Sequence, residues 1–251
     1  MRQIQARLDG VVEGHGVRIL HAIESGSRAW GFPSPDSDYD CRFVYCHPLR
    51  DYARLRPPRD VIETPLTPVL DVSGWDLRKA LDLGLRGNAI VVEWLRSPLV
   101  YRGEAGFAER MDALLDDIVP IPLVARHYAG LARRFAPMGR TMPLKKLFYA
   151  LRPLAALEWL AARDCRALPP MAFGAVLSEI DWPGDAMGEI EKLLERKSRT
   201  RELGEGEVPP AIATLLARLP ALADRLPPSP TRSGTERARE RADDFLLAML
   251  R

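Results

Sequence analysis

The sequence is poor in cysteine and histidine, and it carries no excess of charge of one sign. Its 251 residues include 3 cysteines and 4 histidines, and 36 basic against 34 acidic side chains leave a formal net charge of +2. Cys41, Cys46 and Cys165 have the spacing of neither a zinc site nor a disulfide framework, which is typical of a reducing compartment. The near-neutral balance gives no case for strong charge-driven binding to nucleic acid or a membrane, although a local basic patch could still concentrate charge.

Long apolar runs are missing as well. No stretch of about 18 consecutive apolar residues is present, and the N-terminal segment MRQIQARLDG lacks the apolar centre of a signal peptide. We therefore predict a soluble, cytoplasmic protein that does not enter membranes. Hydrophobic residues make up 47% and charged residues 28%, which is ordinary for a globular protein, and the length allows one large domain or two modest ones.

Strand patterns dominate the first third of the chain. Residues 17–25 form a short apolar run that ends at a glycine, which predicts a buried strand followed by a tight turn. Residues 39–46 alternate and contain aromatic and β-branched side chains, which predicts a second strand. In the segment 61–72, the prolines at 65 and 68 restrict regular pairing, so the third strand is expected in PVLDV.

Helix patterns follow the third strand. Ser73 is expected to cap a helix from about 75 to 85, and Asn88 to cap one over 88–96. A shift to almost wholly helical character near residue 105 predicts an α+β protein, with a small mixed sheet in residues 1–105 and an all-helical domain in 106–251. PPSPTRSG at 227–234 is expected to be a flexible link. The predicted later helices are 106–116, 121–135, 143–163, 171–180, 185–198, 209–219 and 234–250.

The segment most informative about chemistry is SGSRAWGFPSPDSDYD, residues 25–40. Gly26 and Ser27 follow a predicted strand and open a short helical turn, so their backbone N–H groups could face a phosphate. Asp38 and Asp40 begin the next strand two residues apart. Because strand side chains alternate with a period of two, both carboxylates should emerge on one face of the sheet.

Two carboxylates on one face need a cation between them. Without one they repel each other, and each raises the pKa of the other. Mg²⁺ prefers such oxygen ligands and commonly completes its shell with substrate phosphates. A third carboxylate on a neighbouring strand would allow two ions roughly 3.5–4 Å apart, able to activate a hydroxyl and stabilise a leaving pyrophosphate. Asp71, in PVLDV, is the candidate for that third carboxylate.

The stretch GSRAWGFPSPDSDYD resembles the Gly-Ser and Asp-x-Asp signature of the DNA polymerase beta-type nucleotidyltransferase superfamily. Within it, the chain is most similar to the RNA-repair-pathway polymerase-beta-like group of predicted bacterial and phage nucleotidyltransferases. The segments LDVSGWDLRKAL, GNAIVVEWLRSPLVY and KKLFYALRPL extend the resemblance to about residue 160. The Gly-Ser pair combined with Asp-x-Asp is a specific signal, whereas Asp-x-Asp alone would be weak.

The resemblance implies roles for individual residues. Gly26 and Ser27 would bind the nucleoside triphosphate, with ATP the expected one. Asp38, Asp40 and Asp71 would be catalytic and would ligate two Mg²⁺ or Mn²⁺ ions, with Asp71 acting as or supporting the general base. In related enzymes the helical domain supplies phosphate clamps and a base-stacking aromatic. By that analogy Lys145, Lys146 and Arg152 would clamp phosphates and Tyr149 could stack on the base. The other predicted nucleotide-binding residues, in the first 105 residues, are Arg28, Ser37, Lys79 and Asn88.

Simpler interpretations stand beside these. Asp38 and Asp40 could be turn and strand-start residues on a solvated edge, and Asp71 an ordinary surface or cap residue. Ser27 could only cap its helix, a role compatible with phosphate binding. The face around residues 145–152 could be a solvated basic stripe, and Tyr149 could be packed rather than stacked on a base.

The predicted function is a metal-dependent, template-independent nucleotidyltransferase. It would transfer a nucleoside monophosphate from an NTP to a hydroxyl and release pyrophosphate, and the expected acceptor is an RNA 3′ end in RNA repair or processing. One alternative keeps the chemistry but changes the acceptor to a protein side chain or a small molecule such as an antibiotic. Another is a catalytically silent nucleotide-binding or protein-interaction module. The sequence predicts no oligomeric state.

Overall fold

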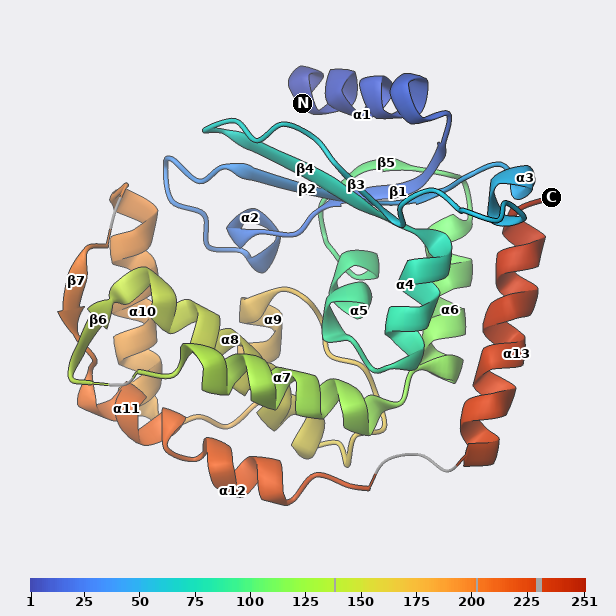
Figure 1. Cartoon of the computed structure of the whole chain (residues 1–251). Coiled ribbons are helices and arrows are strands. Elements are labelled where there is room, and N and C mark those ends of the chain that lie inside the picture. The colour runs from blue at the N-terminus through green and yellow to red at the C-terminus, as the bar shows by residue number, and fades with distance from the viewer. Residues whose placement is uncertain (138, 202, 229–231) are drawn as a thin grey trace. The chain divides into compact units, whose positions relative to one another are not determined.

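The protein is described by a computed structural model that covers residues 1–137, 139–201, 203–228 and 232–251 (Figure 1). The chain forms two compact units. The first consists of Met1–Ala29, Asp38–Pro120 and Pro230–Arg251, and the second of Trp30–Ser37 and Ile121–Ser229. The first unit contains a mixed sheet with helices, and the second consists mainly of helices. This arrangement confirms the predicted α+β class. The functional division at residue 105 stays a prediction.

The first unit is built on a five-stranded mixed sheet. Its strand order is β3-β4-β2-β1-β5, in which β2 and β4 run parallel and the other neighbouring pairs run antiparallel. The parallel pair, β2 and β4, carries Asp40 and Asp71. The strands are β1 (Arg18–Glu24), β2 (Tyr39–Cys46), β3 (Val61–Glu63), β4 (Leu70–Asp76) and β5 (Val100–Gly103).

Helix α1 (Arg2–His15) covers one face of this sheet (Figure 1). Ile4, Leu8 and Val11 are buried, and their spacing places them on a single apolar stripe. This stripe packs on alternate residues of the strands, among them Phe43 and Val72, in a continuous hydrophobic core. Because Phe43 and Val72 point towards α1, the residues next to them in sequence point to the other face.

The other face of the sheet carries the remaining helices of the first unit (Figure 1). The last helix of the chain packs against α4 and α6 and so belongs to this unit. Trp75 of β4 and Trp94 stack here with ring centroids 3.9 Å apart. These helices are α4 (Leu77–Leu85), α5 (Ala89–Leu95), α6 (Phe107–Ile118) and α13 (Arg232–Met249), and the short α3 (Leu49–Tyr52) follows β2.

The second unit is organised around α8 (Leu144–Ala161), which packs along α7 (Ile121–Phe135). All side chains from Ala150 to Leu160 are buried, as expected for a helix that is apolar on most of its circumference. A two-stranded sheet of β6 (Thr141–Pro143) and β7 (Glu205–Glu207) lies at the N-terminal end of α8. The other helices are α9 (Phe173–Leu177), α10 (Gly184–Arg199), α11 (Pro210–Leu216) and α12 (Leu219–Asp224).

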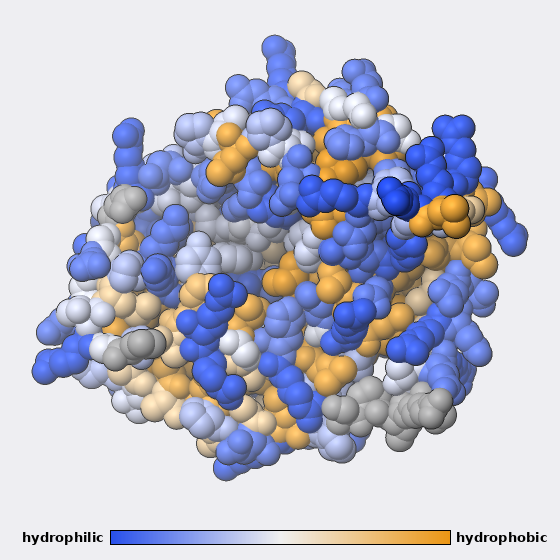
Figure 2. Space-filling model, viewed as in Figure 1, coloured by the Kyte–Doolittle hydropathy of each residue, from blue (hydrophilic) through white to orange (hydrophobic). Residues whose placement is uncertain are grey.

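Polar and apolar residues are interspersed on the face of the molecule shown in Figure 2, as the near-neutral, mixed composition would predict. Among the residues that the structure describes, no helix is both long enough and apolar enough to cross a membrane.

The loop Trp30–Ser37, which separates the Gly-Ser pair from Asp38, is packed within the second unit. Phe32 stacks on Phe148 with ring centroids 4.9 Å apart. Lys197 is 3% exposed, and its Nζ donates a hydrogen bond to the carbonyl oxygen of Phe32 at 2.7 Å. Burial, reinforced by the charge of Lys145, lowers the pKa of Lys197 to about 8. The loop is therefore held by a buried ammonium group.

We expect the stability of the wild-type protein to rise between pH 8 and 10 relative to Lys197→Met. Above about pH 8 the folded lysine has lost its proton, whereas the unfolded one keeps it up to about 10.5, so raising the pH favours folding. The gain at this site is up to about 3 kcal/mol, measurable by urea unfolding at pH 7.5 and 10. A difference between the two proteins that does not change with pH would contradict the buried, charged position of Lys197.

Several sequence predictions need correction at element boundaries. Strand β4 runs on to Asp76, so Ser73 lies inside a strand and does not cap a helix. Asp76 caps α4 instead, since its Oδ1 accepts a hydrogen bond from the N–H of Arg78 at 2.8 Å. Parallel pairing with β2 continues to Asp76 and keeps β4 extended there, although the sequence pattern of a helix begins a few residues earlier.

Other helix predictions differ in extent. The predicted helices at 121–135 and 88–96 are confirmed as α7 and α5, with Asn88 as the cap of α5. The helix predicted over 209–219 is α11, which ends at Leu216, and the helix α12 that follows was not predicted. The helix predicted over 171–180 is only the short α9. The N-terminal helix α1 was not predicted. Of the predicted link at 227–234, residues 229–231 lie outside the described residues, and α13 begins at Arg232.

Candidate active site

Asp40 and Asp71 face each other across the parallel strands β2 and β4. They are register partners, and both point to the sheet face opposite α1. Neighbouring strands lie about 4.7–4.9 Å apart in a sheet, so the two side chains start from adjacent positions. The side chain of Asp40 is 27% exposed and that of Asp71 is 33% exposed, so both are accessible from this face. The structure thus brings together two of the three predicted carboxylates.

Arg42 lies on the same face of β2, two residues after Asp40. One nitrogen, Nη2, is 2.6 Å from Oδ2 of Asp71 and 3.4 Å from Oδ1 of Asp40. The other, Nη1, donates to the backbone carbonyls of Cys41 and Asp71, each at 3.1 Å. A guanidinium group therefore supplies positive charge between the two carboxylates. Arg42 was not predicted as a site residue, although strand alternation places it on the same face as Asp40, two residues further along.

The charge balance around Asp40 remains negative despite Arg42. The pKa of Asp40 is raised to about 6, mainly by burial and in addition by the charges of Asp38, Glu24 and Asp71. Arg42 opposes this effect without cancelling it. When a carboxyl group has a raised pKa and other acidic groups lie nearby, an additional cation would stabilise its ionised form.

Gly26 makes room for the carboxylate of Asp40. An added Cβ at Gly26 would lie 1.9 Å from Oδ2 of Asp40 and 2.8 Å from its Cγ, far inside van der Waals contact. Glycine is therefore required here by the close approach of a side chain. The backbone of the Gly-Ser turn and the second aspartate of Asp-x-Asp form one contiguous group.

Glu24, the last residue of β1, lies beneath this group and is fully buried. Its Oε1 accepts hydrogen bonds from the backbone N–H of Gly26 at 2.9 Å and of Asp40 at 3.0 Å. Its Oε2 accepts from the hydroxyl of Tyr101. Glu24 was predicted to lie in a buried strand, with no partner predicted for its carboxylate. A charged side chain within an apolar run was the available signal, since such groups are almost always paired when buried.

The remaining residues of the motif surround Asp40 less closely. Asp38 is exposed and precedes β2, and it acts on Asp40 through its charge. Arg28 donates from Nε to the carbonyl oxygen of Asp38 at 3.2 Å, and its guanidinium lies 4.1 Å from the centre of the Tyr39 ring. Ser27 begins the short helix α2 (Ser27–Trp30). These contacts tie the start of α2 to the start of β2.

Lys79 and Asn88 have structural partners of their own. Lys79 forms an ion pair with Asp60 at 3.1 Å, and the Oδ1 of Asn88 accepts from the N–H of Ile90 at 2.9 Å. Ser37, in the loop of the second unit, accepts through Oγ from the N–H of Ser34 at 2.8 Å. Nucleotide binding by these three residues stays a prediction.

The basic and aromatic residues predicted on α8 differ in exposure. Lys145 and Lys146 are exposed, Tyr149 is half-buried, and Arg152 is buried with its guanidinium 4.4 Å from the centre of the Trp30 ring. Tyr149 meets the same indole edge-on, at 5.8 Å between ring centroids. Phosphate binding by the three basic residues and base stacking by Tyr149 stay predictions.

The donor chemistry of the Asp40–Asp71 pair fits a divalent metal. Within the described ranges, no three His, Cys, Asp or Glu side chains are already arranged to hold an ion. Two carboxylates nevertheless lie side by side at a position where a cation, here a guanidinium, is accommodated. Hard oxygen ligands of this kind suit Mg²⁺ or Mn²⁺. Metal binding by Asp38, Asp40 and Asp71 together stays a prediction.

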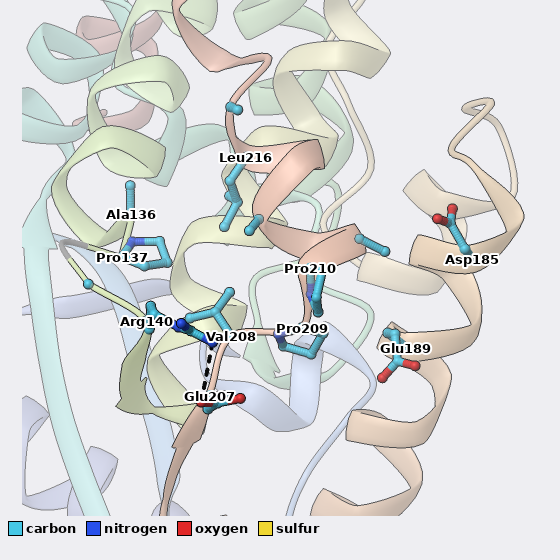
Figure 3. Close-up of a pocket in the computed structure, with 14 residues that line it drawn as sticks. Ala136, Pro137, Arg140, Asp185, Glu189, Glu207, Val208, Pro209, Pro210 and Leu216 are labelled. Atoms are coloured by element: carbon cyan, nitrogen blue, oxygen red, sulfur yellow. Dashed lines mark ion pairs between the residues drawn. The ribbon is translucent and has the colours of Figure 1, made fainter.

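Two cavities lie away from these carboxylates. One, of about 860 Å³, is bordered by α1 and the segment between β3 and β4 in the first unit. The other, of about 880 Å³, lies in the second unit and has apolar walls with Asp185 and Glu189 of α10 on one side (Figure 3). Its Arg140 and Glu207 approach to 3.8 Å. Neither cavity is lined by the Gly-Ser pair or by Asp38, Asp40 or Asp71, so a cavity alone does not identify the candidate site.

Comparisons with known proteins place the chain in a family. Residues 1–248 match the family described as RlaP, RNA repair pathway DNA polymerase beta family. The uncharacterised protein YcgL of Bacillus subtilis (strain 168) is 40% identical over 205 residues, which span 80% of this chain and 78% of YcgL. A crystal structure of a nucleotidyltransferase-like protein from Exiguobacterium sibiricum matches 98% of this chain and 78% of its own, with 14% identity and a TM-score of 0.31. The chain belongs to the RNA repair pathway DNA polymerase beta family.

Proposed function

We propose that the protein is a metal-dependent, template-independent nucleotidyltransferase that transfers a nucleoside monophosphate from an NTP to the 3′ hydroxyl of RNA. The observation that carries the proposal is the pairing of Asp40 with Asp71 on one face of the sheet, with the Gly26 backbone against the Asp40 carboxylate. Membership of an RNA repair pathway family supports RNA as the acceptor. In this proposal the catalytic domain is residues 1–105.

The proposed roles follow from position. Asp40 and Asp71, with Asp38 beside them, would hold two Mg²⁺ or Mn²⁺ ions, which supply charge neutralisation at the α-phosphate and lower the pKa of the attacking hydroxyl. Asp71 is the more exposed of the paired carboxylates and would support deprotonation of that hydroxyl. The N–H groups of the Gly26–Ser27 turn would bind the triphosphate, with ATP the expected donor. Transfer then depends mainly on positioning and electrostatics.

The assay that tests this proposal uses each α-labelled NTP with Mg²⁺ or Mn²⁺ and three acceptor classes. These are pooled RNA, total soluble protein and an aminoglycoside. We expect label on RNA with ATP as donor, no label on RNA whose 3′ end has been oxidised with periodate, and no label with an Asp71→Asn variant.

The other outcomes separate the alternatives. Label on protein or on the aminoglycoside would keep the chemistry and replace the acceptor. NTP binding without transfer to any class would favour a silent nucleotide-binding or protein-interaction module and would contradict the enzymatic proposal.

A further inference from the structure

One buried carboxylate oxygen joins the two sequence motifs of the candidate site. Oε1 of Glu24 accepts from the N–H of Gly26, in the Gly-Ser pair, and from the N–H of Asp40, in Asp-x-Asp. Between these two residues the chain leaves the first unit, since Trp30–Ser37 pack in the second. Covalent connection through this loop therefore does not fix how the two motifs lie relative to each other. The pairing of β1 with β2 does so in part, because the N–H of Ser25 donates to the carbonyl oxygen of Asp40 at 2.9 Å, and the Glu24 side chain adds the bonds to Gly26 and Asp40.

The Glu24 side chain is buried and makes several hydrogen bonds, unlike an acidic side chain that lies on the surface without a role. The side chain has no exposed surface, and Oε2 accepts from the Tyr101 hydroxyl. Its own backbone is fixed on both sides, because its N–H donates to Leu99 and its carbonyl accepts from Ser97 Oγ at 2.6 Å. Burying a carboxylate is costly unless hydrogen bonds compensate, so the structure commits three donors to hold this group in place.

We propose that Glu24 is a positioning residue of the nucleotidyltransferase site. Together with the pairing of β1 and β2, its Oε1 holds the triphosphate-binding turn beside Asp40, so that the turn and the Asp40 carboxylate meet the same nucleotide. This inference rests on the proposed transfer activity and adds a residue that acts through Gly26 and Asp40 without touching substrate. Misplacing reacting groups by about 1 Å can lower a rate about a hundredfold, which sets the size of effect at stake.

Two substitutions separate position from charge. Glu24→Gln keeps the length of the side chain: its amide oxygen can accept from both N–H groups, and its NH₂ can donate to Tyr101. Glu24→Asp keeps the charge but is one methylene shorter, so it cannot reach both backbone donors without moving one of them. Glu13, exposed on α1, provides matched controls in Glu13→Gln and Glu13→Asp.

The experiment measures hydrogen exchange at the amides of Gly26 and Asp40 alongside NTP transfer. In Glu24→Asp we expect both amides to exchange at least about tenfold faster and kcat/KM to fall about fiftyfold. In Glu24→Gln we expect slow exchange and recovery of kcat/KM to within about fivefold of wild type. If Glu24→Asp shows no cooperative unfolding transition, Tyr101→Phe takes its place, with a smaller loss in the same direction.

Three results would overturn the proposal. Fast exchange in Glu24→Asp with unimpaired transfer would leave Glu24 a structural clamp only. Slow exchange in Glu24→Gln with transfer as poor as in Glu24→Asp would show that its charge matters, not its reach. A wild type that transfers to none of the acceptors would refute the proposed function, and the positioning role with it, while the exchange rates would still report the hydrogen bonds.

Discussion

Replacing Asp40 with asparagine should abolish nucleotide transfer and, in the absence of metal, make the protein harder to unfold at pH 8. For activity we expect a loss of at least about a thousandfold, because an amide carries no charge to bind a divalent ion and its NH₂ group would repel one. The shape of the side chain is kept. The loss should therefore appear without loss of the fold.

The expected gain in stability follows from the pKa of Asp40. The folded protein holds the carboxyl at a pKa of about 6, against an ordinary value of 3.8. The protonated carboxyl thus favours folding below about pH 4, and this contribution is lost as the pH rises through about 6. At pH 8 the wild type bears the full cost of a partly buried anion among other anions, up to about 3 kcal/mol, whereas asparagine does not.

Urea unfolding at pH 4 and pH 8, without metal, measures this difference. Asp40→Asn should exceed the wild type in unfolding free energy at pH 8, and the advantage should shrink towards pH 4. Asp243→Asn, at an exposed position of α13, is the matched control and should change neither stability nor transfer. A variant that stays active, or is less stable than wild type at pH 8, would contradict the assignment of Asp40 as a metal-binding carboxylate held against repulsion.

The part of the site that could be predicted from sequence is the part set by short-range periodicity. Asp40 could be assigned to the start of a strand from the alternation in YDCRFVYC, and β2 begins at Tyr39. Asp38, which was predicted to begin the same strand, lies one residue before it. Asp71 could be proposed as the third carboxylate, but its register against Asp40 depends on long-range pairing of β2 with β4. No local pattern specifies which residues of two distant strands lie opposite each other.

The residues that were missed act across long sequence separations. Glu24 reaches Tyr101, and Arg42 reaches Asp71, through contacts that exist only once the sheet is assembled. The extension of β4 to Asp76 has the same origin, because pairing with β2 keeps residues 73–76 extended where local signals favour a helix start. Helix α7, by contrast, was predicted with its observed bounds since its apolar periodicity and flanking prolines are local.

Gly26→Ala should be nearly as damaging to transfer as loss of Asp40, although it adds only a methyl group. The new Cβ would lie 1.9 Å from Oδ2 of Asp40, so the carboxylate must move away. Asp40 would then lose its alignment with Asp71 and with the Gly-Ser turn at once. We expect transfer to fall about a hundredfold or more, and stability by about 1–3 kcal/mol, as for other overpacked sites.

A second alanine substitution shows whether the effect is steric. Gly10 is exposed in the middle of α1, and no atom lies within 4 Å of the position of an added Cβ. Gly10→Ala should therefore stabilise the protein by about 0.5–1 kcal/mol, through helix propensity, without changing transfer. Steady-state transfer and urea unfolding of both variants make the comparison. Full activity in Gly26→Ala would place the working position of the Asp40 carboxylate away from the Gly-Ser turn, and would remove the geometric basis for treating the two motifs as one site.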